Sequence, residues 1–274
     1  MTEEGLRADF TLAVLGAGAM ATALVKGWMA AGLVQPQQVV AADISEQRRA
    51  VMADLNIRTV DAAVKAVQSA QVVLLSVKPQ QIPALLQEIK GHLQPGVLVI
   101  SIAAGITLQQ IEQGLGQDCA VVRVMPNTPC LVNAAAAGIS AGKYAAPAQT
   151  ELVLRLFQAV GTAYLLPEPL LNAVTGLSGS GPAYVYLVIE ALSDGGVAAG
   201  LPREKATALA AQTVLGAARM VLDTGTHPAV LREMVTSPAG TTAAGLLQLE
   251  KAGVRAAFAQ AVLSSATRAD ELGS

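Results

Sequence analysis

The sequence predicts an α/β fold in which a mostly parallel sheet is followed by a part made only of helices. Two observations support this. Short, continuously apolar segments of the kind found in buried strands alternate with helical patterns up to about residue 166. After Pro167 the strand signal disappears, and long helical patterns rich in Ala and Gly follow. We therefore expect two domains, residues 1–166 and residues 167–274.

The composition narrows the class of protein. Hydrophobic residues make up 53% and charged residues 14% of the 274 residues, which favours a large buried surface and an oligomer. With a net charge of −2 and no basic run, nucleic acid is not an expected partner. No apolar run reaches the roughly 18 residues of a membrane helix, and the acidic start Met1–Gly5 lacks the order of a signal peptide. We expect a cytoplasmic protein without a membrane partner.

The two cysteines do not indicate a cross-linked or metal-binding protein. Cys119 and Cys130 are too few, and too irregularly placed, for a disulfide framework or a zinc site. No metal is therefore expected.

A glycine-rich segment follows the first strand and carries the most informative motif of the first domain. Phe10–Leu15 is a short apolar strand, and a helical pattern later runs to Gly32. The glycines allow a tight turn and let the backbone approach a pyrophosphate, and a small sixth residue allows close helix–strand packing. In this strand–turn–helix setting the motif predicts a Rossmann-like, dinucleotide-binding domain. It consists of Gly16, Ala17, Gly18, Ala19, Met20 and Ala21.

The second strand, Val39–Ala42, leads to the residues that bear on cofactor choice. It ends at Asp43, where the acid that reads the ribose of such cofactors belongs, and a carboxylate there favours the free 2′-hydroxyl of NADH. Ser45, Arg48 and Arg49 follow and can instead hold the 2′-phosphate of NADPH. The residues leave NADPH or NADH open.

Later strands also end in small or polar residues, at the edge of the sheet where ligands bind in open α/β folds. Ala103–Gly105 leaves room for a nicotinamide. Lys78 can approach the cofactor or a substrate carboxylate, and an ordinary surface lysine is the alternative. Thr107 and Gln110 predict a capping box. The expected strands are Val72–Ser76, Val97–Ile102 and Ala120–Val124, with weaker signals at Ile139–Ser140 and Ala163–Leu166 around a helix over Pro147–Ala159.

The second domain reads as a series of apolar helices separated by Gly and Pro. Ser180 is the expected N-cap of the first long helix, and Pro182 fits its first turn. Helices that are apolar nearly all round favour an interlocked subunit interface. This first helix is expected to run to about Ala199. The further expected helices cover Arg203–Leu222, Ala229–Met234, Thr241–Lys251 and Arg255–Leu272.

The segment Val235–Thr242 predicts a tight turn that runs into a helix. Pro238 presets φ, and Gly240 tolerates unusual dihedral angles. Free backbone N–H groups and nearby hydroxyls would form a seat for a small carboxylate. The helix dipole adds only about 0.3–1 kcal/mol, so hydrogen bonds must supply the rest. An ordinary helix N-cap is the alternative.

Taken together, these segments resemble the hallmark segments of pyrroline-5-carboxylate reductase, in the right order and over essentially the whole chain. The resemblance implies reduction of 1-pyrroline-5-carboxylate to L-proline by NAD(P)H, the last step of proline biosynthesis. It also implies a Rossmann domain and a helical domain that interlocks as a homodimer, with further assembly into a decamer. The segments are Ser76–Pro79, Ser101–Gly105, Met125–Pro129, Thr175–Tyr184, Asp194–Val197 and Val235–Thr242.

The resemblance also assigns residues to roles. The substrate carboxylate would be held at Ser237, Gly240 and Thr241, and the hydroxyl of Thr242 would face the ring nitrogen. Three positions depart from the family pattern, namely Ala19, Asp43 and Ala239, and Asp43 argues against a strict NADPH preference. The implied cofactor residues are Gly16, Ala17, Gly18, Ala19, Met20, Asp43, Ser45, Ser76, Val77, Lys78, Ala103, Ala104, Gly105 and Asn127.

The chemistry of imine reduction fits these residues. A cyclic imine can arrive already protonated, so a threonine hydroxyl that orients the nitrogen and relays a proton from water is sufficient. His92 and His227 are therefore expected to be structural or solvated rather than catalytic.

Three other classes compete with this interpretation. A β-hydroxyacid dehydrogenase needs a lysine on the interdomain helix, and Ala183–Ala199 contains none. A redox sensor would bind NAD(P) without turnover. An assay of NAD(P)H consumption with pyrroline-5-carboxylate distinguishes such a sensor from a reductase. A structural interaction module is supported only by the apolar helices.

Overall fold

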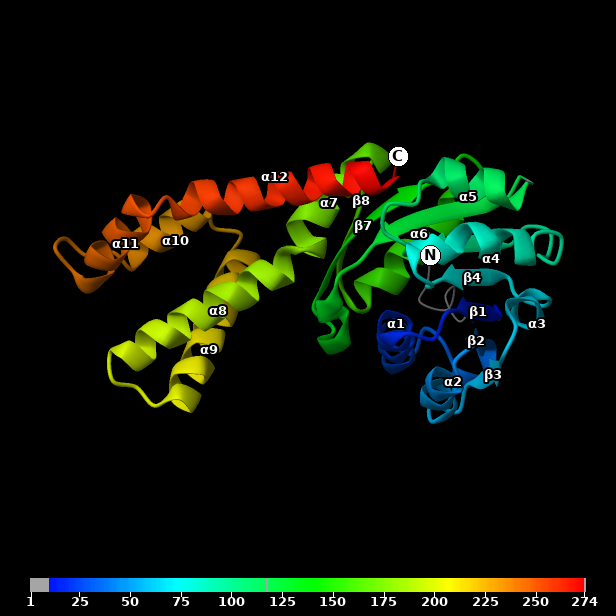
Figure 1. Cartoon of the computed structure of the whole chain (residues 1–274), viewed down its shortest axis with the longest axis horizontal. Coiled ribbons are helices and arrows are strands. Elements are labelled where there is room, and N and C mark those ends of the chain that lie inside the picture. Colours follow the sequence, from blue (N-terminus) through cyan, green and yellow to red (C-terminus); the bar gives the residue numbers. More distant parts are fainter. Residues whose placement is uncertain (1–9, 117, 274) are drawn as a thin grey trace. The chain divides into compact units, whose positions relative to one another are not determined.

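The structure, a computed structural model, describes residues 10–116 and 118–273 (Figure 1). Residues 1–9, which contain the acidic start that was compared with a signal peptide, lie outside the described residues. The chain packs as two compact units, one that runs to Ser180 and includes the stretch from Ser264, and one formed by Gly181–Leu263. The domain boundary between residues 166 and 167 stays a prediction.

The first unit is built on an eight-stranded sheet with the strand order β3-β2-β1-β4-β5-β6-β7-β8. Its neighbouring strands are parallel apart from β6 and β7, which pair antiparallel, so the predicted mostly parallel sheet is confirmed. The strands are β1 (Leu12–Leu15), β2 (Val39–Ala42), β3 (Arg58–Val60), β4 (Val72–Leu75), β5 (Leu98–Ser101), β6 (Ala120–Met125), β7 (Ala135–Ala141) and β8 (Gly161–Leu165).

Apolar layers cover both faces of this sheet, as strands without a polar face require. In β1, Leu12 and Val14 belong to one layer, whereas Ala13 and Leu15 belong to the other. Helices α1 (Ala19–Ala30), α2 (Glu46–Ala53) and α6 (Pro147–Gln158) close the first layer. Helices α3 (Ala63–Val67), α4 (Ile82–Ile89) and α5 (Leu108–Leu115) close the second.

Trp28 fixes the helix that begins at the glycine-rich segment. The fully buried Trp28 donates from Nε1 to the carbonyl oxygen of Leu156 at 2.7 Å, and its ring meets that of Phe157 edge-on with centroids 5.9 Å apart. The buried indole therefore has a partner for its N–H group, and α1 is held against α6.

Two strands differ from the sequence pattern. The pattern does not predict β3, because this edge strand has only three residues and begins with the exposed Arg58. β7 is longer than the expected Ile139–Ser140, because it starts in an alanine run of low strand propensity that pairs with β8.

Helices follow the sheet as predicted. α7 (Leu171–Val174) and a π-helical turn, Thr175–Gly179, still belong to the first unit. The remaining helices are α8 (Gly181–Ala198), α9 (Arg203–Thr224), α10 (Pro228–Met234), α11 (Thr241–Lys251) and α12 (Val254–Gly273).

The prediction that Ser180 is an N-cap is wrong. Its dihedral angles are helical (φ −86°, ψ −21°), and its N–H donates to the carbonyl oxygen of Thr175 at 2.8 Å, which completes the π-turn. An N-cap residue instead has extended dihedral angles and accepts from the helix start. The hydroxyl oxygen of Ser180 lies 2.8 Å from that of Ser265.

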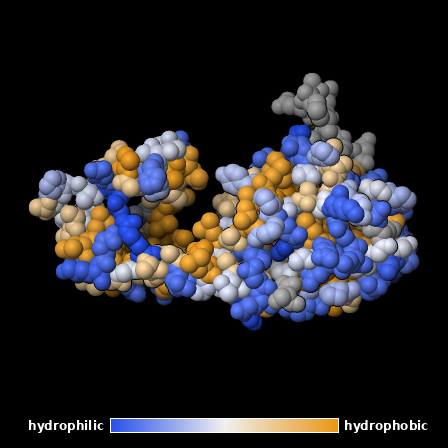
Figure 2. All heavy atoms as spheres, turned by 90° about the horizontal axis from the view of Figure 1, so that it is seen from above, coloured by the Kyte–Doolittle hydropathy of each residue, from blue (hydrophilic) through white to orange (hydrophobic). Residues whose placement is uncertain are grey.

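The unit Gly181–Leu263 buries little of its own surface. Its buried residues are Ser193, Ala206 and Ala210, whereas large apolar side chains are exposed along its helices. Figure 2 shows apolar patches on these C-terminal helices. None of the helices in the described part of the chain is both long enough and apolar enough to cross a membrane. The exposed side chains include Val185, Tyr186, Leu187, Leu192, Leu209, Leu215, Met220, Val230, Met234, Leu247, Leu249 and Phe258.

Candidate active site

The turn between β1 and α1 can be made only with glycine at its first position. Gly16 has φ +95°, and a Cβ atom there would lie 2.7 Å from the carbonyl oxygen of Ser76, at the end of β4. The N–H of Gly16 donates to the carbonyl oxygen of Ala42, at the end of β2. The turn is therefore clamped between the carboxyl ends of two strands.

The N-terminus of α1 is prepared for an anion. Gly18 is the N-cap and has no side chain to accept from the first N–H groups of the helix. A Cβ atom on Gly18 would have no heavy atom within 4 Å, so the space in front of the helix is open. Open space and helix N–H groups that point into it are what a pyrophosphate needs.

A pocket of about 650 Å³ lies in front of this helix and collects most of the predicted cofactor residues. Its volume is in the range of sites for cofactor-sized ligands. These observations fit a dinucleotide. The predicted residues that line it are Gly16, Gly18, Ala19, Met20, Asp43, Ser76, Val77 and Lys78.

The pocket also includes residues that the sequence pattern did not single out. Asp61 and Ala62 directly follow β3, so a sequence pattern that predicted this strand would also have pointed to them. Gln80 and Gln81 directly follow the Ser76–Pro79 segment. Ile44 directly follows Asp43 and is 86% exposed, which leaves an apolar surface beside the pocket.

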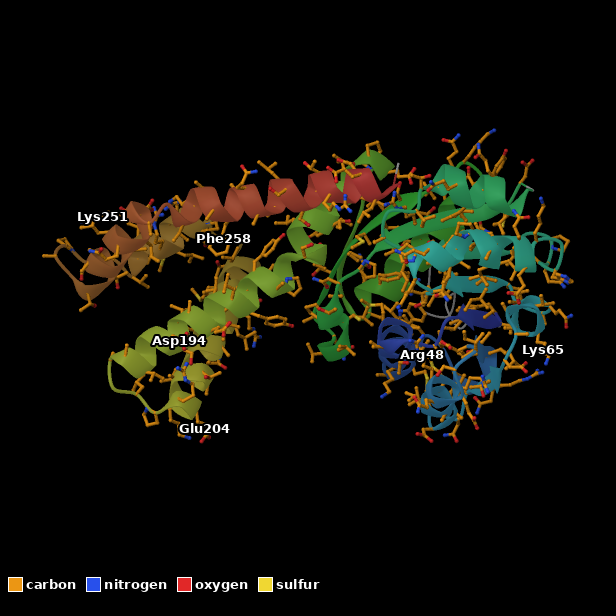
Figure 3. All side chains as sticks on the ribbon, in the orientation of Figure 1. Arg48, Lys65, Asp194, Glu204, Lys251 and Phe258 are labelled. Atoms are coloured by element: carbon orange, nitrogen blue, oxygen red, sulfur yellow. The ribbon has the colours of Figure 1, made fainter. Side chains whose placement is uncertain are left out.

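Asp43 holds the surrounding loops together. Its side chain is 4% exposed, and its Oδ2 accepts from the N–H of Ala17 at 2.8 Å, while Oδ1 accepts from the N–H of Ser45 at 2.8 Å. Arg48, labelled in Figure 3, lines the pocket with its Nη1 atom 3.6 Å from Oδ2. Arg49 instead donates to the carbonyl oxygens of Asp43 and Ile44.

Six predicted cofactor residues lie outside the lining of this pocket, and two of them, Ala17 and Ser45, donate their backbone N–H groups to Asp43. Ala103, Ala104 and Gly105 follow β5 at the carboxyl edge of the sheet, and Gly105 has φ +76°. The amide of Asn127 is used internally, because Nδ2 donates to the carbonyl oxygen of Ser178 and Oδ1 accepts from the N–H of Ala136, both at 2.9 Å. Contacts of these residues with the cofactor stay predictions.

The predicted turn before α11 is present. The N–H of Gly240 donates to the carbonyl oxygen of Ser237 at 3.0 Å, and Pro238 occupies the second position. The unusual dihedral angle lies at Ala239 (φ +56°), as in a type II turn, and not at the expected Gly240 (φ −77°). A Cβ atom at Gly240 would lie 2.3 Å from Oγ of Ser237, so a side chain here would displace the Ser237 hydroxyl.

The start of α11, like that of α1, has no side-chain cap. Gly240 is the N-cap without a side-chain hydrogen bond, and the first turn contains no acidic residue that would compete for an anion. Thr241 is exposed and Thr242 is half-buried in the single chain. Backbone N–H groups and hydroxyls are therefore available together for a carboxylate.

His227 and the two cysteines are not placed for catalysis. His227 is the N-cap of α10, where its Nδ1 accepts from the N–H of Ala229 at 3.2 Å, as its structural interpretation predicts. Burial raises the pKa of Cys119 to about 11 and also raises the pKa of Cys130, so both thiols stay protonated at neutral pH. Among the described residues no group of His, Cys, Asp and Glu side chains is arranged to hold a metal ion.

Comparison with known proteins connects both parts of the chain to one enzyme family. The family profile for pyrroline-5-carboxylate reductase dimerisation matches residues 168–272, and the profile for NADP oxidoreductase, coenzyme F420-dependent, matches residues 11–105. The chain is 48% identical over 260 residues to the pyrroline-5-carboxylate reductase of Methanosarcina acetivorans, which covers 94% of this chain and 96% of that protein.

Solved structures agree. The structure of a pyrroline-5-carboxylate reductase from Coxiella burnetii has a TM-score of 0.91 at 36% identity and covers 97% of this chain and 99% of that one. The Plasmodium falciparum pyrroline carboxylate reductase, solved with NADP bound, has a TM-score of 0.88 at 30% identity and covers 97% and 98%. The chain belongs to the pyrroline-5-carboxylate reductase family of NAD(P)-dependent oxidoreductases.

Proposed function

We propose that the reduction of 1-pyrroline-5-carboxylate to L-proline, the last step of proline biosynthesis, is divided between the two parts of this chain. Residues 1–166 hold NAD(P)H, and residues 167–274 hold the substrate and form the subunit interface. The observation that carries the first assignment is the open N-terminus of α1 above the Gly16 turn. The second rests on the uncapped N-terminus of α11.

The cofactor side is built for binding and orientation. The N–H groups of Ala19 and Met20 would receive the pyrophosphate, and the surface beside Asp43 would receive the adenosine. When bound, NAD(P)H supplies the hydride for the imine carbon. Small residues at Ala103–Gly105 leave room for the nicotinamide ring, and Asn127 supports the neighbouring loop through its two amide hydrogen bonds.

The substrate side pins two groups of one small molecule. Ser237, Gly240 and Thr241 would hold the carboxylate by hydroxyl and backbone N–H donors. The helix dipole adds up to about 2 kcal/mol where the site is partly buried. The hydroxyl of Thr242, one residue further along α11, would face the ring nitrogen.

This arrangement suits an imine better than an alcohol. The ring nitrogen can arrive protonated, so Thr242 needs only to orient it and relay a proton from water. Most of the rate enhancement then comes from positioning, with the reacting atoms held about 3–3.5 Å apart.

The apolar helices require a second copy of the chain. Gly181–Leu263 has almost no core of its own, and its large apolar side chains are exposed. The unit lies within residues 168–272, which the dimerisation profile matches. We therefore expect a homodimer, and we include further assembly into a decamer in the proposal. Its place is the cytoplasm, and neither nucleic acid nor a membrane is an expected partner.

The test is an assay of the purified protein. Loss of NAD(P)H absorbance that requires 1-pyrroline-5-carboxylate, with L-proline identified by chromatography, is the expected result. A protein that binds NAD(P)H but consumes neither cofactor with this substrate would be a sensor rather than a reductase. Crystals soaked with L-proline should show its carboxylate at Ser237–Thr241; density elsewhere would contradict the proposed substrate site.

A further inference from the structure

The carboxylate of Asp43 occupies a fixed position at the end of β2. Both of its oxygens accept main-chain N–H groups at 2.8 Å, one from Ala17 in the glycine turn and one from Ser45 before α2. Because these donors belong to two separate loops, the carboxylate cannot rotate away from a ligand without breaking one of the bonds. With its side chain 4% exposed, its charge is also poorly screened by water.

The two neighbouring arginines are not equivalent. The guanidinium of Arg49 is turned to main-chain carbonyls, at 2.7 Å from that of Asp43 and 3.1 Å from that of Ile44. Arg48 lines the pocket, but its side chain is 56% exposed and it lies beside Asp43. Asp61 lines the same pocket, but its carboxylate is paired with Lys65 at 2.8 Å.

A ligand that reaches this end meets a site for a hydroxyl rather than for a phosphate. Each oxygen of Asp43 has a second lone pair, which can accept from a ribose 2′-hydroxyl. A 2′-phosphate carries up to about two negative charges at neutral pH and would face a fixed, buried carboxylate. Solvent screens the exposed Arg48 more strongly than the buried Asp43, so the repulsion outweighs the attraction.

We propose that Asp43 makes this reductase select NADH over NADPH, with Arg48 as the group that allows residual use of NADPH. This inference rests on the proposed function only in that the pocket takes a nicotinamide cofactor. It decides between the two cofactors that the family assignment leaves open.

The test is calorimetric binding of NADH and of NADPH to the whole protein without substrate. The unmodified protein should bind NADH at least about tenfold more tightly than NADPH, because like charges brought together in a binding site weaken binding. Asp43→Asn removes the charge but keeps one acceptor oxygen, and the ratio should move toward NADPH by about the same factor. Arg48→Gln should weaken the binding of NADPH more than that of NADH.

Arg58→Gln is the matched control, because it removes one positive charge from the neighbouring strand β3 at a residue outside the pocket lining. It should leave the ratio of the two affinities unchanged. Equal or tighter binding of NADPH by the unmodified protein would overturn the inference, whether or not Asp43→Asn folds.

Turnover separates this inference from the proposed function. If NADPH is preferred while 1-pyrroline-5-carboxylate is still reduced, only the cofactor inference fails. If NADH binds more tightly but no reduction occurs, only the proposed reaction fails.

Discussion

At the scale of single residues, Thr242 and Ala239 decide different properties of the same turn. Thr242 carries the hydroxyl assigned to the ring nitrogen and sits in the first turn of α11. Ala239 sets the path of the chain into that helix with its positive φ. One residue is expected to affect turnover and the other to affect stability.

Thr242→Ala should lower kcat/KM by about 10²-fold, the lower end of the range for positioned proton-transfer groups. The affinity for NAD(P)H should stay within experimental error, because the cofactor pocket belongs to other residues. Steady-state kinetics and direct cofactor titration measure the two effects, and Thr242→Ser should keep most of the activity. Unchanged turnover in Thr242→Ala would remove this hydroxyl from the mechanism.

Ala239→Gly should raise the free energy of unfolding by about 0.5–1 kcal/mol. A positive φ costs an L-residue about 1–2 kcal/mol, and glycine relieves this strain. Glycine also gives the unfolded chain more conformational entropy, which offsets about 0.4–1 kcal/mol of the gain. Urea unfolding at one fixed protein concentration measures the difference.

The reverse change is the control for this prediction. Gly253 has φ +69° and open space around its Cβ position, so Gly253→Ala should lower stability through the backbone alone. A destabilised Ala239→Gly protein would mean that the alanine methyl group makes a contact worth more than the strain.

At the scale of elements, Glu168 joins three parts of the sheet domain. Its Oε1 accepts from Nη1 of Arg123 on β6 at 3.0 Å and from the N–H of Leu108 at the start of α5 at 2.7 Å. The neighbouring cap is the predicted box, in which Oγ1 of Thr107 accepts from the N–H of Gln110 and Oε1 of Gln110 accepts from the N–H of Thr107. The loop with Ala103–Gly105 is therefore anchored directly before α5.

Glu168→Ala should destabilise the protein by about 3 kcal/mol, because it leaves the 4% exposed side chain of Arg123 without its counter-charge. Urea unfolding measures the loss. Asp223→Asn breaks the exposed pair with Arg219 and should leave the unfolding curve unchanged. Equal effects of the two substitutions would show that Arg123 finds another partner or water.

Elements with a strong local signal could be predicted from the sequence, and those set by context could not. Continuous apolar runs predict β1 and β2, and the pair Thr107 and Gln110 predicts the start of α5. β3 has too few residues for a pattern. The helical state of Ser180 follows from the π-turn before it, whose bonds depend on a backbone path that no single residue specifies.

The features of the candidate site also fall into those that the sequence predicts and those that depend on structural context. Glycine at Gly16 is dictated by local geometry, so the motif alone predicts the turn. The different directions of Arg48 and Arg49 depend on which carbonyl groups lie nearby, and adjacent positions on a helix do not reveal that. At the second turn, the pattern predicts the bend but places the unusual dihedral angle one residue too late.

At the scale of the whole molecule, assembly and activity should be lost together. Removal of the chain from Arg255 onward takes away most of α12 and should give an inactive protein that no longer dimerises. A milder change is Leu187→Glu, which places a charge on a 63% exposed leucine of α8 and should raise the dimer dissociation constant by at least about tenfold.

Analytical ultracentrifugation and the reductase assay check both variants. Val51→Glu is the matched control, because Val51 is also exposed but lies on α2 of the sheet domain. It should leave the dimer intact. An active monomer from either variant on the helical side would contradict the shared interface.

The scarcity of buried residues in Gly181–Leu263 has a consequence for the life of the protein in a cell. In a newly synthesised chain the apolar surface of these helices stays exposed until the chain associates with a second copy. Proteases can cleave the helical part during that interval. The fraction of chains that is assembled then depends on protein concentration, so the rate of synthesis affects both the amount of the enzyme and the share of it that is assembled and stable.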